Sequence, residues 1–496
     1  MAISCDPSVL AQAARCFNDC HHSHALAQSV KTYLLCQYSN SAPSSVAAPS
    51  NPDIDDASIS TSVTFTWTNN ASPAATTNEI WSQKNGGAYA LLGTVAGNVA
   101  TFTDNAPGLV NGDERFYKVR ACNGTTCSAF TDPRSVALRL GTLGIANYNS
   151  PFLVIHFGNF DTASAGVVLT VNFALLRRVK SAGLDLGSVF LDNEANLVSV
   201  SMPSLQTVPD SFLGFTCPKF TTLVLTSLQT IGNSFQFGGA NITGNFALPA
   251  LTSVVGLFDV DSNPLLTGLS VPVLSTVGAD CFVHLTAISN ASFPSLQSVG
   301  GNFRLGENVN LLTVSCPALT TIGGGLSTFN SAGMTSMSFP VLANMGGASI
   351  SCSGCTALLA ANFPALIAVG AGIGMDVDFS NCTALASISF PNMFLIGDFA
   401  FSGCAVLTSV TLTNATFSDG GFILDFFGDA VAAGNSLAGT GINGILHRGA
   451  VSPGPLTSDN FNLNGGTNAG AAALSAQGTA DAAFLTGNGN TVTLNP

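Results

Sequence analysis

The hydrophobic positions of residues 190–415 recur with a period of about 23 residues, which is the most regular pattern in the chain. Each unit follows Leu-x-x-Val-x-x-Pro-x-Leu-x-x-Val-Gly-x-x-Phe, with apolar residues alternating with polar ones. Such a period predicts a solenoid, in which each coil buries its apolar side by stacking on its neighbours. The proline position falls in successive units at Pro203, Thr226, Pro249, Pro272, Pro294, Pro317, Pro340, Pro364 and Pro391.

Within a unit, the alternation predicts short β-strands, and the glycine after the valine is expected to form the corner between two of them. Residues 293–303 and 363–370 show the pattern clearly. Recurrent leucine at this period is typical of leucine-rich repeats, so we expect a leucine-rich-repeat β-solenoid over residues 190–415. Residues 141–189 are expected to form a strand-rich cap at its N-terminal end.

One repeat unit carries a family resemblance. Residues 396–410, Ile-Gly-Asp-Phe-Ala-Phe-Ser-Gly-Cys-Ala-Val-Leu-Thr-Ser-Val, resemble the BspA-like leucine-rich repeats of surface and adhesion proteins. The resemblance implies a fold and a binding surface, but it implies no particular ligand.

Three cysteines in these repeats share the phase Cys-x-x-Leu, namely Cys355, Cys382 and Cys404. Their common phase predicts an inward-facing ladder at the place where other leucine-rich repeats carry asparagine. We interpret it as a structural row of small buried thiols. A metal-binding or redox role is the alternative.

The N-terminal residues 1–40 are predicted to form a helical hairpin. Asp6 can cap a helix whose first residue is Pro7, and apolar residues follow at helical spacing as far as Phe17. Residues 41–53 are rich in serine, proline and alanine, which is typical of a linker.

Residues 46–140 show short alternating strands and turn signals, which predict a β-sandwich. The stretch resembles a bacterial fibronectin type III domain, because Trp67 lies where that family has an early core tryptophan and residues 117–128 match its penultimate strand and hairpin. The resemblance implies a spacer or adhesion module. Cys122 and Cys127 flank Asn-Gly-Thr-Thr and could form a disulfide across a hairpin; two free thiols are the alternative.

Both ends of the chain resemble parts of phage proteins. Residues 416–496 resemble a terminal segment of phage and prophage structural proteins, and we expect them to add repeats and to cap the open edge of the solenoid. Residues 5–17 and 32–35 resemble the opening of phage-encoded virion proteins. The chain departs from that pattern at residues 20–24, Cys-His-His-Ser-His, which occupy the turn between the two helices.

The same N-terminal segment concentrates residue types that bind zinc. Their spacing fits no closed zinc motif, so no metal site is predicted, and a polar turn with buried thiols is expected instead. The residues are Cys5, Cys16, Cys20, His21, His22, His24 and Cys36.

Charge and composition limit the partners and locations that the sequence predicts for this chain. The net charge is −13, and Lys219 and Arg304 are the basic residues between positions 181 and 447, so no nucleic-acid partner is expected. Gly, Ser, Thr and Asn interrupt every apolar run, so no membrane insertion is expected. The first residues lack a basic stretch followed by an apolar one, so we expect no secretory leader. Thirteen cysteines, an odd number, leave at least one thiol free or paired between chains.

Two Asp-x-Asp pairs are the strongest candidates for chemistry. Asp259 with Asp261, and Asp376 with Asp378, place both carboxylates on one face of a strand. The pairs are five coils apart, about 24 Å at roughly 4.8 Å per coil, which is too far for one glycosidase site. Each pair is interpreted as solvated surface carboxylates, with cation or sugar binding as the alternative.

The sequence predicts no catalytic residue, because its histidines lie in no nucleophile motif and no phosphate-binding loop is present. No cofactor is expected. We interpret the chain as a virion structural protein, a tail fibre, receptor-binding or capsid decoration protein, that attaches to host-surface glycan or protein. Residues 1–40 would bind other virion proteins, and a homo-oligomer is expected. The alternatives are a bacterial cell-surface adhesin and a polysaccharide-degrading tail spike.

Overall fold

The chain divides into two compact units, Met1–Ala137 and Leu138–Pro496, and each is described by itself. The predicted helical anchor of residues 1–40 lies outside the described residues. The described part is mainly β-structure. The computed structural model describes residues 46–58, 62–70, 75–110, 112–138, 153–157, 160–161, 170–180, 186–346, 349–369, 375–393, 395–411, 416–417, 423–425, 446, 459–463, 470–471 and 474–496.

The N-terminal unit contains two antiparallel sheets. One has the order β1-β2-β5, and the other has the order β8-β6-β3-β4 with β7 beside β6. The strands are β1 (Ser50–Ser58), β2 (Ser62–Thr68), β3 (Thr77–Lys84), β4 (Ala90–Ala96), β5 (Thr101–Asp104), β6 (Asp113–Asn123), β7 (Thr126–Cys127) and β8 (Arg134–Leu138).

The core of this unit comes from the alternate residues of β2, β3 and β6, as the sequence pattern predicts. The ring of Phe65 packs 5.6 Å from that of Trp67 and 6.1 Å from that of Tyr117 on the other sheet. All three side chains are buried. Residues 50–53, predicted as the end of a linker, lie in β1.

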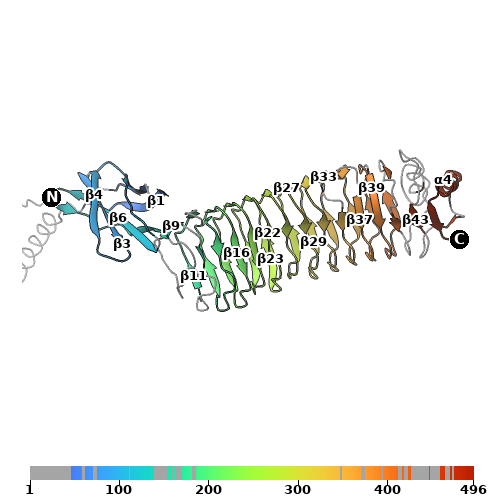
Figure 1. Ribbon diagram of the computed structural model, residues 1–496, viewed down its shortest axis with the longest axis horizontal. Helices are drawn as coiled ribbons and strands as arrows, with labels where there is room; N and C mark the ends of the chain where they lie inside the picture. Colours follow the sequence, from blue (N-terminus) through green and yellow to red (C-terminus); the bar gives the residue numbers. More distant parts are fainter. Residues whose placement is uncertain are drawn as a thin grey trace, which may run out of the picture. The chain divides into compact units, whose positions relative to one another are not determined.

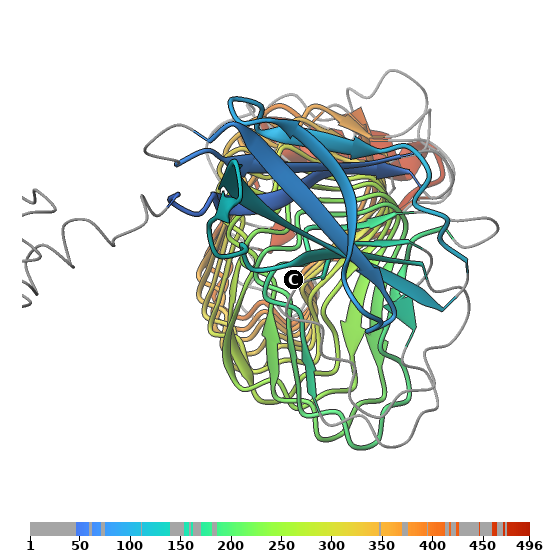
Figure 2. The same cartoon turned by 90° about the vertical axis from the view of Figure 1, so that its left-hand side faces the viewer.

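The C-terminal unit is a β-solenoid whose strands form three parallel faces (Figure 1). Most described coils give one strand to each face, although the last ones add none to face 1. The strands pair with those of the next coil along faces 1 and 2, while face 3 is divided into four shorter sheets. Figure 2, which looks along this stack, shows its coils overlying one another. The solenoid part of the prediction is therefore confirmed. Pairing begins at β9, within residues 141–189 that were expected to form a cap.

The faces contain the following strands. Face 1 comprises β9 (Leu153–Phe157), β12 (Arg178–Lys180), β15 (Thr207–Val208), β18 (Thr230–Ile231), β21 (Ser253–Val254), β24 (Thr276–Val277), β27 (Ser298–Val299), β30 (Thr321–Ile322), β33 (Asn344–Met345) and β36 (Ala368–Val369). Face 2 comprises β10 (Phe160–Asp161), β13 (Val189–Phe190), β16 (Phe212–Phe215), β19 (Phe235–Gly238), β22 (Phe258–Asp259), β25 (Cys281–Phe282), β28 (Phe303–Arg304), β31 (Leu326–Ser327), β34 (Ser349–Ser351), β37 (Met375–Asp378), β39 (Leu395–Ala400), β42 (Ile423–Asp425), β43 (Asn460–Leu463) and β44 (Thr491–Leu494), with β41 (Thr416–Phe417) beside β39. Face 3 comprises β11 (Thr170–Asn172), β14 (Ser199–Ser201), β17 (Thr222–Val224), β20 (Gly244–Ala247), β23 (Leu266–Ser270), β26 (Asn290–Ser292), β29 (Thr313–Ser315), β32 (Ser336–Ser338), β35 (Ala360–Asn362), β38 (Ser387–Ser389) and β40 (Ser409–Thr411).

Stacked phenylalanines fill the interior of the solenoid. The rings of Phe212, Phe235 and Phe258, one from each of three successive coils, lie 5.6 and 5.5 Å apart. Phe363 and Phe390 stack at 5.1 Å in the same way. Because each coil has one apolar side, stacking like residues at the repeat period buries that side and holds the coils in register.

The glycine that follows the valine of each unit lies in the bend between a face 1 strand and a face 2 strand, as the sequence predicts, but its backbone does not adopt positive φ. Gly278, Gly300 and Gly323 all lie outside the set of residues with positive φ. A Cβ atom on any of them would lie less than 3.0 Å from a carbonyl oxygen of the preceding coil. The repeated glycine is therefore needed because two backbones approach closely on face 1.

A different residue makes the sharp turn at the end of each face 2 strand. At this position the backbone adopts positive φ, which glycine and asparagine tolerate best. Leu285, with φ of 54°, is the least suited of the set. The set is Asn193, Thr216, Gly239, Ser262, Leu285, Glu307, Asn330, Gly354, Asn381 and Gly403.

The C-terminal end adds a helix that the sequence pattern did not predict. Helix α4 (Ala476–Gly487) connects β43 to β44, and the Ser475 hydroxyl caps it by accepting a hydrogen bond from Gly478 N–H at 3.0 Å. Strand β44 then pairs with β43 at the end of face 2. Among the described residues, no helix combines the length and apolar character needed to cross a membrane.

Candidate functional site

The outward side chains of face 2 form rows that cross the coils. Asp259 lies beside Phe282, and Phe282 lies beside Arg304, because β22, β25 and β28 pair in register. The next outward side chains on the first two coils are Asp261 and His284, which also lie close together. We call the side chains gathered here the β22–β31 patch: Asp259, Asp261, Phe282, His284, Arg304 and Phe329.

Two carboxylates and an imidazole converge in the β22–β31 patch. Asp259, Asp261 and His284 can each offer one ligand atom, and these atoms all lie within 4.8 Å of one another. Asp259 Oδ1 and His284 Nδ1 are buried and have no hydrogen-bond partner. Asp261 Oδ2 accepts a hydrogen bond from the Ser262 hydroxyl at 3.1 Å. Asp259 is therefore not the fully solvated carboxylate that the sequence favoured.

The electrostatics of this group follow from its half-buried position. Burial, and then the negative charge of Asp261, raise the pKa of Asp259 to about 7. Burial lowers the pKa of His284, and the positive charge of Arg304 adds to this effect, while Asp261 and Glu307 oppose it. Near neutral pH the environment thus favours a neutral imidazole.

Arg304 is held in place by its neighbours on face 2. Its guanidinium forms an ion pair with Glu307 at 2.6 Å and lies 4.9 Å from the centre of the Phe329 ring. Its Nε is buried without a hydrogen-bond partner. An arginine held between an acid and an aromatic ring presents a fixed donor group beside the neighbouring groove.

Glycines make room for the larger side chains of the β22–β31 patch. A Cβ atom on Gly238 would lie less than 3.0 Å from Asp261 Oδ1, and one on Gly306 would lie 2.8 Å from the ring of Phe329. A side chain at either position would displace its neighbour in the next coil. The patch therefore depends on the small residues that flank it.

A shallow groove of about 280 Å³ adjoins these residues. Phe282 and Phe329 contribute aromatic rings to its lining, and Arg304 contributes a charge. The remaining lining residues are Asn302, Gly325, Leu326, Ser327 and Ser349. A second groove, of about 480 Å³, runs along face 1 and is lined by Ser, Thr, Val, Gly and other uncharged residues.

The second Asp-x-Asp pair lies elsewhere on face 2. Asp376 and Asp378 belong to β37, which is separated from β22 by the strands β25, β28, β31 and β34. At about 4.8 Å per strand the two pairs are about 24 Å apart, so they do not form one site. Asp378 Oδ1 accepts a hydrogen bond from Ser380 N–H at 2.8 Å.

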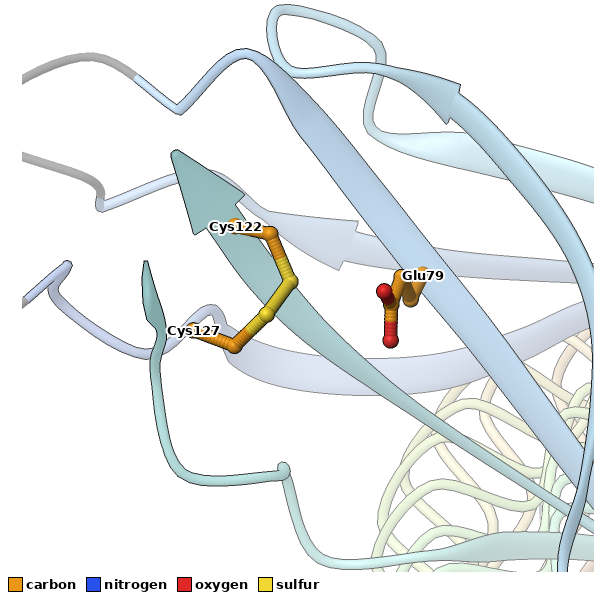
Figure 3. Close-up of side chains that lie close together, drawn as sticks. All are labelled: Glu79, Cys122 and Cys127. Carbon is orange, nitrogen blue, oxygen red and sulfur yellow. A yellow bond between two sulfur atoms is a disulfide. The ribbon is translucent and has the colours of Figure 1, made fainter. Parts of the chain in front are cut away.

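Cys122 and Cys127 form a disulfide that joins β6 to β7. Glu79 lies beside it, as Figure 3 shows. The carboxylate of Glu79 accepts hydrogen bonds from Arg120 Nε at 2.8 Å and Trp81 Nε1 at 3.0 Å. Because both sulfur atoms are in the disulfide and the carboxylate is already paired, this group is poorly suited to bind a metal.

Cys355, Cys382 and Cys404 point inward at equivalent positions in the last repeats, and all three are buried. Each thiol donates to a carbonyl oxygen within the stack, at 3.1 to 3.2 Å. A hydrogen bond with Cys355, followed by burial, raises the pKa of Cys382, which keeps its thiol protonated. The row is thus a structural ladder of hydrogen bonds.

The ladder extends beyond the cysteines that the sequence pattern identified. Cys217 donates to Leu191 O at 2.9 Å, and Asn263 donates to Phe237 O at 2.9 Å. Asn308 donates to Val283 O at 2.7 Å. Asparagine and cysteine therefore both occur at this position of the repeat, and both connect neighbouring coils. The Cys/His-rich segment of residues 5–36 lies outside the described residues.

Sequence reasoning missed His284, Arg304 and Phe329 as partners of the first Asp-x-Asp pair. The signal that identifies His284 is the repeat period itself, because it follows Asp261 by one period of 23 residues. In a solenoid, residues one period apart lie side by side. The repeat period therefore places His284 beside Asp261.

Comparisons with known proteins support the repeat assignment. Residues 373–422 match the family described as "BspA type Leucine rich repeat region (6 copies)". No curated protein sequence matches the chain. The leucine-rich-repeat part of the sequence prediction is thus confirmed over the matched residues, whereas the fibronectin and phage assignments stay predictions.

Solved structures give weak likenesses. "Titin kinase and its flanking domains" has 20% identity and a TM-score of 0.16, with 18% of this chain and 16% of that chain covered. A twitchin kinase region from C. elegans has 18% identity, a TM-score of 0.17 and the same two coverages. Pectate lyase PelI from Erwinia chrysanthemi, in complex with tetragalacturonic acid, has 9% identity and a TM-score of 0.16, with 75% of this chain and 98% of that chain covered.

These TM-scores are too low to support an inference about fold or function, and the chain spans only about a sixth of the two kinase-region structures. The conclusion that the comparisons do support is that residues 373–422 are similar to leucine-rich repeats of the BspA type.

Proposed function

We propose that this chain is a non-enzymatic attachment protein that binds cell-surface glycans through the outer side of its solenoid. The observation that carries the proposal is the groove beside the β22–β31 patch, where two aromatic rings lie next to Arg304, Asn302 and serine hydroxyls. Aromatic rings pack against the apolar faces of sugars, while arginine, asparagine and serine exchange hydrogen bonds with hydroxyl groups. The BspA type repeats are in keeping with a surface-binding role.

The groove is shallow, so each solenoid is expected to bind weakly. A groove of about 280 Å³ accommodates only a short stretch of a glycan. Several chains displayed together would bind a repetitive surface much more tightly than one chain does. This is the reason to propose a homo-oligomer, held together through residues 1–40.

We further propose that the chain is displayed on a virion, as a tail fibre, receptor-binding or capsid decoration protein. The proposal rests on the resemblance of both chain ends to phage proteins. In this arrangement residues 1–40 bind other virion proteins, and residues 46–140, proposed as a fibronectin type III-like module, act as a spacer. The alternative is a bacterial cell-surface adhesin, which the BspA type repeats fit equally well.

Fractionation of the source culture separates these two locations. Mass spectrometry that detects the chain in purified particles, together with electron microscopy that shows it at a symmetric position, would support the virion proposal. Recovery of the chain from cell envelopes, with none in particles, would favour the adhesin.

The glycan proposal is tested with the purified full-length chain on arrays of bacterial envelope polysaccharides. Arg304→Gln and Phe329→Ser are expected to weaken binding about tenfold or more, because each removes one side of the groove. Lys219→Gln is the control, since Lys219 is exposed and bonds to Asn196 instead. Binding to cells that survives periodate oxidation but is lost after protease treatment would reject a glycan in favour of a protein receptor.

The same arrays test the proposal that the chain is not an enzyme. Release of reducing ends from any bound polysaccharide, abolished by Asp259→Asn or Asp376→Asn, would replace the attachment proposal with a polysaccharide-degrading spike. We expect no release from the unaltered chain.

A further inference from the structure

We propose that Asp259, Asp261 and His284 bind one divalent transition-metal ion of the zinc class on face 2 of the solenoid. This inference is independent of the proposed attachment function, because it depends on three side chains of two adjacent coils and on no external partner.

The geometry is close to that of a metal site. The candidate ligand atoms of the three side chains lie within 4.8 Å of one another. Zinc bonds to nitrogen and oxygen of about 2.0 to 2.2 Å place tetrahedral ligands about 3.4 Å apart. The three side chains are half-buried; Asp259 lies in β22, and Asp261 and His284 lie two residues after β22 and β25, which pair with each other, so small rotations about their side-chain bonds suffice to close this difference.

Unpartnered atoms provide a second and independent observation. Asp259 Oδ1 and His284 Nδ1 are both buried and lack any hydrogen-bond partner. Buried polar atoms normally have a hydrogen-bond partner, because an atom that gives up its hydrogen bonds to water and gains none within the protein raises the free energy of the folded state. A cation between the two coils would satisfy the carboxylate oxygen and a neutral imidazole nitrogen at once.

Other outward carboxylates of face 2 behave differently. Asp192 Oδ1 accepts a hydrogen bond from Phe215 N–H at 2.8 Å, and Asp280 Oδ1 accepts one from Asn302 Nδ2 at 3.1 Å. Asp378 accepts a bond from Ser380 N–H. These carboxylates accept hydrogen bonds from backbone or side-chain donors of the chain, whereas Asp259 Oδ1 accepts none. The difference points to a ligand at Asp259.

The ligand set indicates the class of ion. Imidazole nitrogen suits zinc and its first-row neighbours, while magnesium and calcium prefer six or more oxygen ligands. Three protein ligands on one side of a sheet leave further coordination positions open toward solvent. Such a site would take up zinc with water completing its coordination.

The experiment is a zinc titration of the full-length chain after dialysis against EDTA, with bound zinc measured by mass spectrometry. Other groups in the chain can also bind zinc, so the difference between variants is the quantity that matters. His284→Gln and Asp261→Asn are each expected to bind one equivalent fewer than the parent chain. Asp376→Asn, which alters the other Asp-x-Asp pair of face 2, is expected to bind as many equivalents as the parent.

A second measurement separates metal loss from misfolding. Zinc should raise the unfolding temperature of the parent chain and of Asp376→Asn, followed by circular dichroism, but not that of the two ligand variants. Asp261→Asn keeps the size of the side chain, so it remains informative if His284→Gln folds poorly. Equal zinc stoichiometry in the parent, His284→Gln and Asp261→Asn would overturn the proposal, as would an equal loss in Asp376→Asn.

Discussion

At the scale of the residue, each coil depends on two adjacent positions at the end of its face 2 strand. The first adopts positive φ, and the second is buried; where the second side chain carries a donor, as in the pair Ser262 and Asn263, it donates a hydrogen bond to a neighbouring coil. Glycine or asparagine fits the first position without strain. Leu285 occupies this first position, although its side chain is 46% exposed and therefore buries little apolar surface.

Replacing Leu285 by asparagine is expected to stabilise the solenoid by about 1 kcal/mol, because strain of a non-glycine residue at positive φ costs on the order of 1–3 kcal/mol. Asparagine already occupies the equivalent positions 193, 330 and 381. Chemical denaturation followed by circular dichroism measures the change. The matched control is Leu312→Asn, which removes a similarly exposed leucine that does not have positive φ; an equal gain in both variants would contradict the explanation.

The inward position is tested by Asn308→Ala. The Asn308 side chain donates to Val283 O and Leu305 O, and it accepts bonds from the backbone and hydroxyl of Thr286, all at 3.0 Å or less. Removing it leaves buried groups unpaired, which we expect to cost about 3 kcal/mol of unfolding free energy. Asn245→Ala, at an exposed position of face 3, should change stability by less than about 0.5 kcal/mol in the same denaturation experiment.

At the scale of the element, the strands follow the alternating pattern closely, but their corners do not follow simple residue preference. The glycine of the Val-Gly dipeptide lies in the predicted bend between face 1 and face 2, but it is needed there because a side chain would clash with the preceding coil, not because the backbone adopts positive φ. The sequence pattern also did not predict helix α4. Its Ala, Gly and Thr residues form no marked apolar face, so no periodic signal identifies it.

Gly300→Ala tests the close approach on face 1. The new Cβ atom would meet the carbonyl oxygen of Gly278, which is backbone and cannot move aside without separating the coils. We expect a loss of about 2 kcal/mol or more in unfolding free energy, comparable to overpacking a core. Gly487→Ala, at the end of α4 where a Cβ would meet nothing within 4 Å, is the control. If Gly300→Ala left the unfolding free energy unchanged, the coils would be able to separate easily at face 1.

At the scale of the whole molecule, the two units can be followed separately in solution. The chain has two tryptophans, and both Trp67 and Trp81 lie in strands of the N-terminal unit. Tryptophan fluorescence therefore reports on that unit alone, while circular dichroism is dominated by the longer solenoid.

Acid is expected to destabilise the N-terminal unit through Asp113. Burial opposes ionisation of this carboxyl, but bonds from Lys84, Val110 N–H and Asn85, and the charge of Lys84, bring its pKa below the usual value. Its contribution is therefore present above the unfolded pKa of about 3.9 and is lost as the pH falls through the lower, folded value.

The measurement is the fluorescence-detected unfolding temperature of the N-terminal unit between about pH 7 and pH 2. Asp113→Asn should lower that temperature at neutral pH and flatten its fall in acid, because the variant has no carboxylate to protonate. Asp132→Asn, an exposed aspartate of the same unit, is the matched control. Parallel acid profiles for Asp113→Asn and the parent chain would show that another group dominates.

The sequence by itself determined the solenoid, because in a repeat protein each contact joins residues one period apart, and the period is visible in the order of residues. It also placed the cysteine ladder and separated the two Asp-x-Asp pairs. Only the tertiary structure decided which atoms of Asp259 and His284 are buried without partners, why Gly300 must lack a side chain, and how β2, β5 and β1 pair in the N-terminal unit. These features depend on distances between backbones and on pairing between distant segments, neither of which leaves a periodic trace in the sequence.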